Sequence, residues 1–343
     1  MLRLELLPAC EGDCLVLSWG DAAAPRRMLI DGGRSVTAGA VKAYAAEHRL
    51  GEGAFELFVI THIDRDHIEG AVDLLGEACF RRLVKEVWFN DRADLDYHPA
   101  PGFEEYGALD GERITRLIRD HGISTNLPFA PKPVAMTGDD LTVVELAGGL
   151  TLTLLSPDLK QLKALADPWD ETMAAAPLGW EDFGDDQPID VAWMAARPFR
   201  SDSAKPNGSS IAFVASYGDV HILLTGDAHV GRLQRSLELF RVANPEARFS
   251  LVKTSHHGSR GNTSAELVRL LDCSRWAVST NGTQFRHPDL EAVARIAAGS
   301  PAPVQLFFNY DTGQTSIWRG PFKQPVAIDA FYGIDGYIAI DVA

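Results

Sequence analysis

A seven-residue turn carries the clearest structural signal in this chain: Thr61-His62-Ile63-Asp64-Arg65-Asp66-His67. It follows the apolar run Phe55 to Ile60, which predicts a buried strand, and it precedes residues 68–80, whose apolar positions repeat at helical spacing. Two histidines and two aspartates on one turn bring four metal-binding side chains into a small volume. We therefore expect a metal site where this strand ends.

Strand and helix patterns alternate on both sides of the turn. Short apolar runs at Leu2 to Leu7, Cys14 to Trp19 and Arg27 to Ile30 predict strands. A helix is expected at Ser35 to Leu50 and a further strand at Val84 to Phe89. This order predicts an α/β protein layered around sheets, with functional loops at the strand ends.

The second half of the chain repeats the pattern of a strand followed by a metal-binding side chain. Two strands joined at Gly218-Asp219 lead to Asp227, and the strand Phe249 to Lys253 leads to His256-His257. In a sheet flanked by helices, such strand ends gather along one edge. We therefore expect these residues to meet those of the turn at 61–67.

Two other regions are less regular. Between about residues 90 and 206 the pattern loosens, and the part at about 160–205 is rich in Asp, Trp and Pro. This part is either an acidic surface insertion or a lid over the site. Near the end of the chain, Val304 to Tyr310 and Thr315 to Trp318 predict a hairpin. We expect a single domain over residues 1–343 that carries this insertion.

Composition limits the range of partners. The chain has 343 residues and a formal net charge of −15, which works against broad electrostatic capture of nucleic acid. Bound divalent cations would offset part of that charge locally, so a nuclease is not excluded. The sequence shows no signal peptide and no apolar stretch long enough for a membrane span. We expect a cytoplasmic protein without a membrane partner, and a homo-oligomer is left open.

The candidate ligands indicate hydrolytic chemistry. Imidazoles and carboxylates without thiolates suit Zn²⁺, Mn²⁺ or Fe in a catalytic site. They outnumber the needs of one tetrahedral ion, whereas two divalent ions about 3.5 to 4 Å apart, bridged by a carboxylate and a water, would use them all. Such a pair supplies a bridged hydroxide near neutral pH and stabilises charge on the attacked centre.

Taken together, the motifs resemble the metallo-β-lactamase fold superfamily, and within it most the hydrolase domain of the DNA-uptake protein ComEC and its stand-alone relatives. The matching motifs, in chain order, are Gly12-Asp13, Asp31-Gly32-Gly33, Thr61 to His67, Asn207 to Ser210, Leu223 to Asp227, His256 to Ser259 and His287-Pro288. They extend over nearly the whole chain. The resemblance implies a four-layer αββα sandwich with an insertion around 90–206.

The resemblance also implies a role for each motif residue. One metal would take His62 and Asp64, the other would take Asp66, His67 and His257, and Asp227 would bridge them. The residues assigned to catalysis are Asp66, His256 and His287, with His256 either a proton donor or the alternative ligand. Residues expected behind the ligands or on the substrate side are Asp31, Gly12, Asp13, Asn207, Ser210 and Asn281.

The chain departs from the superfamily at two places. Asp64 stands where most members have His, as in the ComEC-like branch, and this carboxylate favours Mn²⁺ over Zn²⁺. The usual histidine of the third motif is missing, and Asn207-Gly208-Ser209-Ser210 takes its approximate place. One of the two metals would then be weakly held.

Three functions remain open on this basis. The first is a metal-dependent phosphodiesterase acting on DNA, RNA or a small phosphodiester; the resemblance favours nucleic acid, and the acidic charge favours the small substrate. The second is hydrolysis of a lactam, lactone or thioester, against which Asp64 argues. The third is a metal-stabilised module without activity in a larger assembly, against which the complete ligand set argues.

Overall fold

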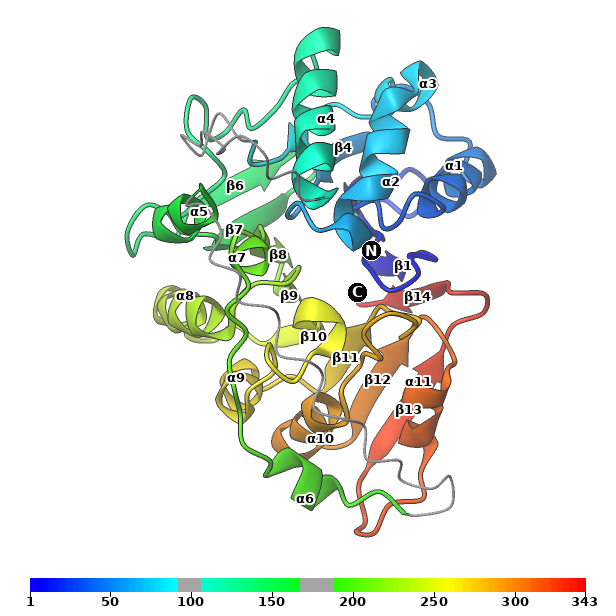
Figure 1. Ribbon diagram of the computed structural model, residues 1–343, viewed down its shortest axis with the longest axis vertical. Coiled ribbons are helices and arrows are strands. Elements are labelled where there is room, and N and C mark those ends of the chain that lie inside the picture. Colours follow the sequence, from blue (N-terminus) through cyan, green and yellow to red (C-terminus); the bar gives the residue numbers. More distant parts are fainter. Residues whose placement is uncertain (92–105, 167–187) are drawn as a thin grey trace.

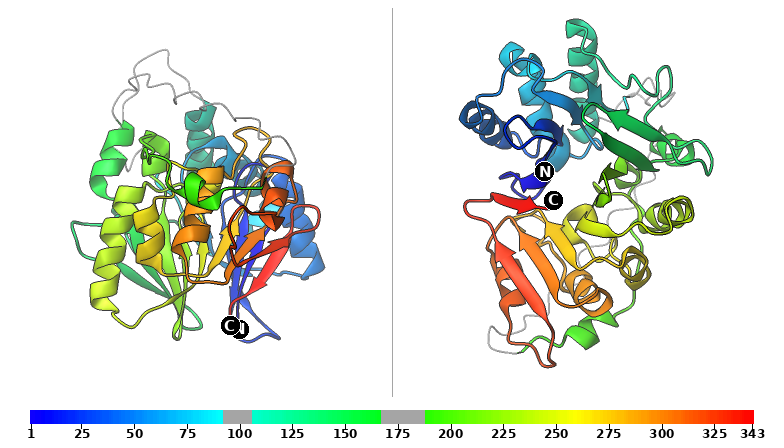
Figure 2. Two further views of the ribbon diagram at one scale, coloured as in Figure 1. Left: turned by 90° about the horizontal axis from the view of Figure 1, so that it is seen from below. Right: turned by 180° about the vertical axis from the view of Figure 1, so that it is seen from behind.

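The computed structural model describes residues 1–91, 106–166 and 188–343. Two β-sheets lie face to face, and helices cover the outer face of each (Figure 1, Figure 2). The four-layer αββα sandwich expected from the motifs is confirmed.

The first sheet has six strands in the spatial order β14-β1-β2-β3-β4-β5. They are β1 (Leu2–Leu6), β2 (Leu15–Trp19), β3 (Arg26–Ile30), β4 (Phe55–Val59), β5 (Val87–Trp88) and β14 (Ile338–Asp341). Neighbours from β14 to β3 pair antiparallel, whereas β3, β4 and β5 run parallel. The last strand of the chain thus lies beside the first.

The second sheet has eight strands in the order β13-β12-β11-β10-β9-β8-β7-β6. They are β6 (Val143–Leu146), β7 (Leu150–Ser156), β8 (Ala212–Tyr217), β9 (Val220–Leu224), β10 (Phe249–Lys253), β11 (Arg275–Val278), β12 (Val304–Phe308) and β13 (Ile328–Tyr332). Strands β6 to β9 pair antiparallel, and β9 to β13 pair parallel.

The helices divide between the two outer faces. On the first sheet lie α1 (Thr37–Glu47), α2 (Arg65–Gly76), α3 (Ala78–Arg81) and α4 (Tyr106–His121). On the second lie α6 (Val191–Ala195), α8 (Val230–Ala243), α9 (Ala265–Leu271) and α10 (Leu290–Gly299). Shorter connecting elements are α5 (Leu159–Ala166), α7 (Lys205–Gly208), η2 (Ser255–Gly258), α11 (Gly313–Ser316) and η3 (Ile317–Arg319).

Alternating side chains along the strands build the cores between the layers. Leu15, Leu17 and Trp19 of β2 point into the core between the sheets, whereas Val16 packs with the residues of α1 and α2. This alternation follows from the two-residue repeat of a strand. Burial of each such side chain contributes on the order of 1.5–3 kcal/mol, so the apolar pattern holds the sheets together and fixes their register.

Two sequence expectations about local structure are wrong. The helix expected from Ile68 begins at Arg65, so Asp66 and His67 lie on the first helical turn. The hairpin expected over Val304 to Trp318 does not form. There Thr312 and Thr315 make a capping box that starts α11, Trp318 is buried in the core, and β12 pairs instead with the parallel strand β13.

Residues 167–187, and with them much of the expected insertion at about 160–205, lie outside the described residues, as do residues 92–105 of the wider irregular region. The division into one domain with an insertion stays a prediction. Among the helices in the described parts of the chain, none combines the length and the apolar composition that a bilayer crossing requires.

Candidate metal centre

The predicted site residues gather at one edge of the sandwich. Asp31 follows β3, His62 follows β4, Asp227 follows β9 and His257 follows β10. Because β3 is parallel to β4 and β9 is parallel to β10, the carboxyl ends of each pair share an edge. In Figure 2 these strand ends point the same way, so residues far apart in the sequence meet in one cluster.

Asp31 fixes the orientation of two predicted ligands, His62 and His67. Its buried carboxylate accepts hydrogen bonds from the Thr61 backbone N–H (2.7 Å), the Thr61 hydroxyl (2.8 Å) and His67 Nδ1 (2.8 Å). Because the Thr61 hydroxyl proton goes to Asp31, its oxygen accepts from His62 Nδ1 at 3.0 Å. His62 and His67 therefore carry a proton on Nδ1 and turn Nε2 into the cluster, as metal ligands do.

His257 has the same tautomer and faces His67. Its Nδ1 donates to the Ser279 carbonyl at 3.0 Å, and its Nε2 lies 3.2 Å from His67 Nε2. As neutral rings, the two would oppose their Nε2 lone pairs at this distance. A cation, either a proton or a metal ion, is needed to make the contact favourable.

Asp227 lies between the histidines. Its Oδ2 is 3.8 Å from Nε2 of His62 and 3.8 Å from Nε2 of His257, and its Oδ1 is 3.4 Å from Nε2 of His67. Within the described residues, His62 Nε2 and Asp227 Oδ1 are buried without a hydrogen-bond partner. Buried polar atoms normally have one, so these two are free to coordinate a cation.

Four groups of ligand atoms in the described residues lie mutually within 4.8 Å. Two of them consist of predicted ligands: His62, His67 and Asp227 form one, and Asp66, His67 and His257 form the other, while the remaining two include Asp13. Asp66 Oδ2 is 3.3 Å from His257 Nε2. Asp64 Oδ2 is 3.5 Å from His62 Nε2, yet Asp64 joins no such group among the described residues. Its side chain is 38% exposed, so Asp64 lies on the solvent side of the cluster.

The cluster is rich in negative charge. Asp13, Asp31, Asp66 and Asp227 converge there, and Lys253 is the fully buried cation beside them. Burial by itself would raise the pKa of Asp66 and of Asp227, but neighbouring histidines, His67 first, hold both pKa values below the usual range. Ionised carboxylates in a buried site need compensating charge. The donor set therefore fits divalent cations.

Lys253 is a site residue that sequence reasoning missed. Its ammonium lies 2.8 Å from Asp13 Oδ2, and both side chains are buried. Asp13 Oδ1 in turn lies 3.4 Å from His257 Nδ1. Burial opposes ionisation of Asp13, but Lys253 and then His257 hold its pKa well below the usual range. A lysine at the end of an otherwise apolar strand was the signal in the sequence.

His256 occupies a different place from His257, although both have left-handed backbones with φ of 47° and 53°. Its Nε2 lies 3.7 Å from Asp227 Oδ2, and its side chain is 23% exposed, against 1% for His257. Burial would lower the pKa of His256, but Asp227 and Asp202 raise it to about 10. His256 belongs to none of the mutually close ligand groups in the described part of the chain.

The remaining predicted residues lie around the cluster in different ways. Ser210 Oγ accepts from the Asp227 backbone N–H at 3.1 Å, and Asn207 Nδ2 is 3.2 Å from His256 Nδ1. The His287 ring is 5.3 Å from that of His256. Burial and the two neighbouring histidines hold the pKa of His287 well below its usual value.

Gly12 and Asn281 are the last two residues that were expected behind the ligands or on the substrate side. A Cβ at Gly12 would lie 1.7 Å from the carbonyl oxygen of Asp66, so only glycine fits behind this ligand. The Asn281 side chain accepts from the backbone and the hydroxyl of Thr283, and it therefore folds onto its own loop. Asn281 is not brought into the cluster by any contact of the described residues.

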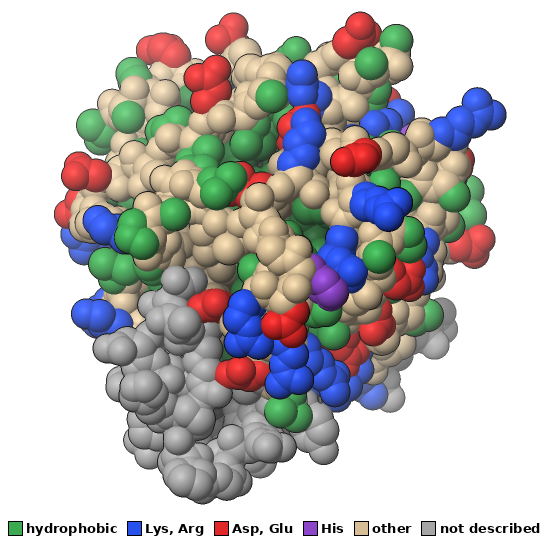
Figure 3. Space-filling view, turned by 90° about the horizontal axis from the view of Figure 1, so that it is seen from above, with side chains coloured by type: hydrophobic (Ala, Val, Ile, Leu, Met, Phe, Trp, Pro, Cys, Tyr) green, Lys and Arg blue, Asp and Glu red, His purple; other side chains and the backbone are tan. Residues whose placement is uncertain are grey.

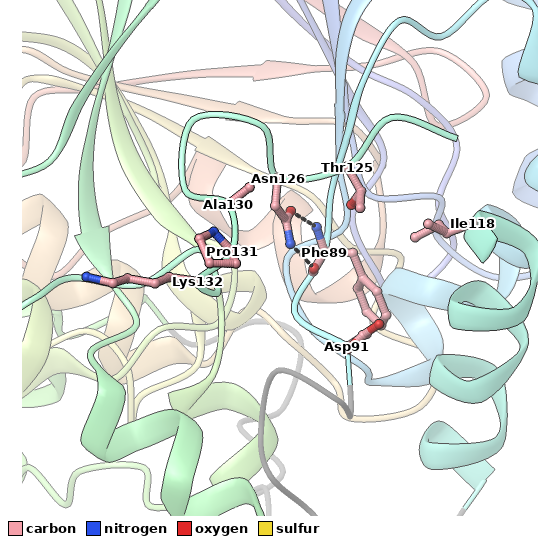
Figure 4. Close-up of a pocket in the computed structure, with 8 residues that line it drawn as sticks. All are labelled: Phe89, Asp91, Ile118, Thr125, Asn126, Ala130, Pro131 and Lys132. Atoms are coloured by element: carbon pink, nitrogen blue, oxygen red, sulfur yellow. Dashed lines mark hydrogen bonds between the residues drawn. The ribbon is translucent and has the colours of Figure 1, made fainter. Parts of the chain in front are cut away.

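A separate hollow, of about 180 Å³, lies beside the end of β5. Figure 4 shows Asn126 there. Its side-chain amide accepts a hydrogen bond from the Phe89 backbone N–H and donates one to the Phe89 carbonyl. The other lining residues are Asp91, Ile118, Thr125, Ala130, Pro131 and Lys132. None of them is a predicted site residue.

The layers and the place of the motifs agree with the superfamily that the sequence resembles. The chain has a metallo-β-lactamase fold. Over 100 residues it is 27% identical to ComE operon protein 3 of Bacillus subtilis (strain 168); the aligned part is 29% of this chain and 12% of that protein. The alignment thus covers only a small part of ComE operon protein 3. No family model matches it.

Two solved structures are similar to this metallo-β-lactamase-fold chain. Human tRNase Z, short form, aligns over 99% of both chains with a TM-score of 0.45 and 10% identity. A metallo-β-lactamase from Erythrobacter litoralis, with β-mercaptoethanol in its active site, aligns over 68% of this chain and 75% of its own, with a TM-score of 0.28 and 14% identity.

Proposed function

We propose that this protein is a metal-dependent phosphodiesterase that holds two divalent cations, Mn²⁺ or Zn²⁺. The facing Nε2 atoms of His67 and His257, 3.2 Å apart with both Nδ1 protons engaged elsewhere, carry the proposal. Carboxylates around them add the negative charge that suits divalent cations. When bound, a pair of such cations supplies a nucleophilic water near neutral pH and takes up charge on phosphoryl oxygens.

The residues divide between two cation positions. Asp66, His67 and His257 would hold one, while His62, Asp64 and Asp227 would hold the other, with Asp227 shared. Asp31 keeps His67 and, through Thr61, His62 in the ligating tautomer. The exposed position of Asp64 supports a more open second site, from which a substrate could approach.

His256 would give a proton to the leaving oxygen. Its side chain is the more accessible of the paired histidines, and neighbouring acids raise its pKa to about 10, which keeps the ring protonated at neutral pH. His287, whose pKa is lowered, is the less suitable donor. This favours His256 over His287 as the general acid.

The substrate class follows from charge. The chain has a formal net charge of −15. On the face shown in Figure 3, Lys and Arg side chains lie among Asp and Glu side chains. Long nucleic acids bind through many phosphate contacts. We therefore favour a small phosphodiester, with single-stranded DNA or RNA as the alternative.

The test is turnover with verified metal content. Protein loaded with Mn²⁺ or Zn²⁺ is assayed on bis-p-nitrophenyl phosphate, cyclic nucleotides and single-stranded DNA, with nitrocefin and a lactone as acyl substrates. We expect phosphodiester hydrolysis that His67→Ala abolishes. Fully loaded protein that turns over none of the phosphodiesters contradicts the proposal, and turnover of the acyl substrates alone would replace it.

A further inference from the structure

Three polar atoms surround Nδ1 of His256. Two are acceptors, Asn262 Oδ1 at 3.1 Å and Asp202 Oδ2 at 3.6 Å, and the third is the donor Asn207 Nδ2 at 3.2 Å, which gives a hydrogen bond to Asp202 Oδ2. Asp202 Oδ2 also accepts hydrogen bonds from Asn207 Nδ2 at 2.7 Å and from Asn262 Nδ2 at 3.1 Å. The four side chains therefore form one connected network beside the cluster.

The orientation of the Asn262 side-chain amide decides whether Nδ1 of His256 carries a proton. Asn262 Nδ2 faces three acceptors: Asp202 Oδ2, the Asp227 carbonyl at 3.2 Å and the Ala228 carbonyl at 3.4 Å. A flipped amide would put an oxygen against three oxygens, so the nitrogen must lie there and Oδ1 must face His256. His256 Nδ1 therefore donates a proton to Asn262 Oδ1.

With Nδ1 fixed, the other nitrogen of His256 is directed toward the cluster. Nε2 is 3.7 Å from Asp227 Oδ2. It stays outside the groups of mutually close ligand atoms in the described residues, and its side chain is partly exposed. This placement suits a group that reaches the substrate beside the metals, rather than a group enclosed by them.

Asp202 comes from a segment remote in sequence from His256, and that segment is firmly attached. The Asp202 N–H donates to the Gly261 carbonyl at 3.0 Å, and Asp202 Oδ1 accepts from the Ala204 N–H at 2.9 Å. The buried Arg295 donates to the carbonyls of Arg197 and Arg260, which joins the same two segments. Asp202 is thus built into the wall behind His256.

We propose that Asp202 and Asn262 are positioning residues that hold the His256 ring with Nδ1 turned to the wall and Nε2 turned to the reacting phosphodiester. This inference rests on the proposed function for its reaction. Water oxygen bonds to phosphorus, and the phosphorus–oxygen bond to the leaving alcohol breaks with its electron pair on oxygen. That oxygen takes the Nε2 proton of His256. Solvent returns a proton to Nε2 and accepts the one lost by the attacking water.

The first test compares two leaving groups. Asp202→Asn and Asn262→Ala are assayed on bis-p-nitrophenyl phosphate, whose leaving group needs no proton, and on a dinucleoside phosphate, whose alkoxide does. General acid catalysis contributes about 10²–10⁴-fold, so kcat on the dinucleoside should fall at least about tenfold more than kcat on the nitrophenyl diester. Equal losses on both substrates would overturn the inference.

Two further measurements separate positioning from ligation and from the proposed function. Metal content should equal that of the wild type in both variants, because His256 is not a ligand; loss of one equivalent of metal would overturn the inference. In metal-free protein, nitrogen NMR should show the hydrogen-bonded Nδ1 proton of His256 in the wild type and in the control Asp219→Asn, an exposed turn residue, but not in Asn262→Ala. If the wild type cleaves no phosphodiester, the proposed function fails and this NMR result alone decides the positioning.

Discussion

His67 and His257 face each other through their Nε2 atoms at 3.2 Å, while Asp31 and the Ser279 carbonyl hold the Nδ1 protons. His67 lies on the first turn of α2, which follows β4, and His257 lies in η2, which follows β10; the two strands belong to different sheets. Only a shared cation makes this contact favourable. In metal-free protein that cation is a proton, which makes the stability of the protein depend on pH.

The first prediction is the direction of that dependence. Burial opposes protonation, but Asp227 and other acids raise the pKa of His256 to about 10 and that of His257 to about 9, from an ordinary 6.5. A raised folded-state pKa stabilises the protein fully below about pH 6.5, and this contribution is lost as the pH rises through 9 to 10. The melting temperature of chelator-treated protein should fall across this window and should change less with metal bound. A melting temperature that rises with pH there would contradict the assignment.

Asp31→Asn should weaken metal binding without unfolding the protein. The amide cannot accept from Thr61 and His67 as a carboxylate does. His67, and through Thr61 also His62, would lose the hydrogen bond that fixes its tautomer. Removal of such a supporting group typically costs about 10–100-fold in metal affinity. Chelator competition measures the affinity, and Asp120→Asn, at the exposed end of α4, is the control. Unchanged affinity in Asp31→Asn would remove this residue from the site.

Lys253→Met should destabilise the protein by about 3–5 kcal/mol, because it leaves Asp13 buried without its ammonium partner. Adding Asp13→Asn should recover part of the loss, since the unpaired charge is then gone. Urea unfolding of the single and double variants gives the coupling between the two residues. The exposed Lys163→Met should change stability by less than about 0.5 kcal/mol. Additive losses at Lys253 and Asp13 would show that the pair does not act as a unit.

Gly12→Ala tests the packing behind the ligands. The new Cβ would lie 1.7 Å from the Asp66 carbonyl oxygen, so the start of α2 must shift. We expect a loss of about 1–3 kcal/mol in stability together with weaker metal binding. Gly39→Ala, in the helix α1 with no neighbouring atom within 4 Å, should instead be neutral or stabilise by up to about 1 kcal/mol. Equal behaviour of the two variants would refute the close approach at Gly12.

Some of this molecule was predictable from local patterns. The strand from Phe249 to Lys253 has the expected bounds, and the helix expected at Ser35 to Leu50 forms over Thr37–Glu47. Other expected elements did not form as predicted. Residues 315–318 looked like a strand, but the buried Trp318 and the cap at Thr312 turned them into helix.

The site, too, was predictable from local patterns only in part. The identities and order of His62, His67, Asp227 and His257 are local properties, because ligand chemistry and the position after an apolar strand can be recognised in short stretches. What each residue does was decided only by the tertiary structure. Asp64 and Asp66 are chemically identical neighbours on one turn, yet Asp64 is 38% exposed and Asp66 lies 3.3 Å from His257. Asp202 and Asn262 carry no local signal of their roles, and Lys253 is marked only by its place at the end of a mostly apolar strand. Their hydrogen bonds and ion pairs cross large sequence separations, and only the packed sheets bring those atoms within reach of each other.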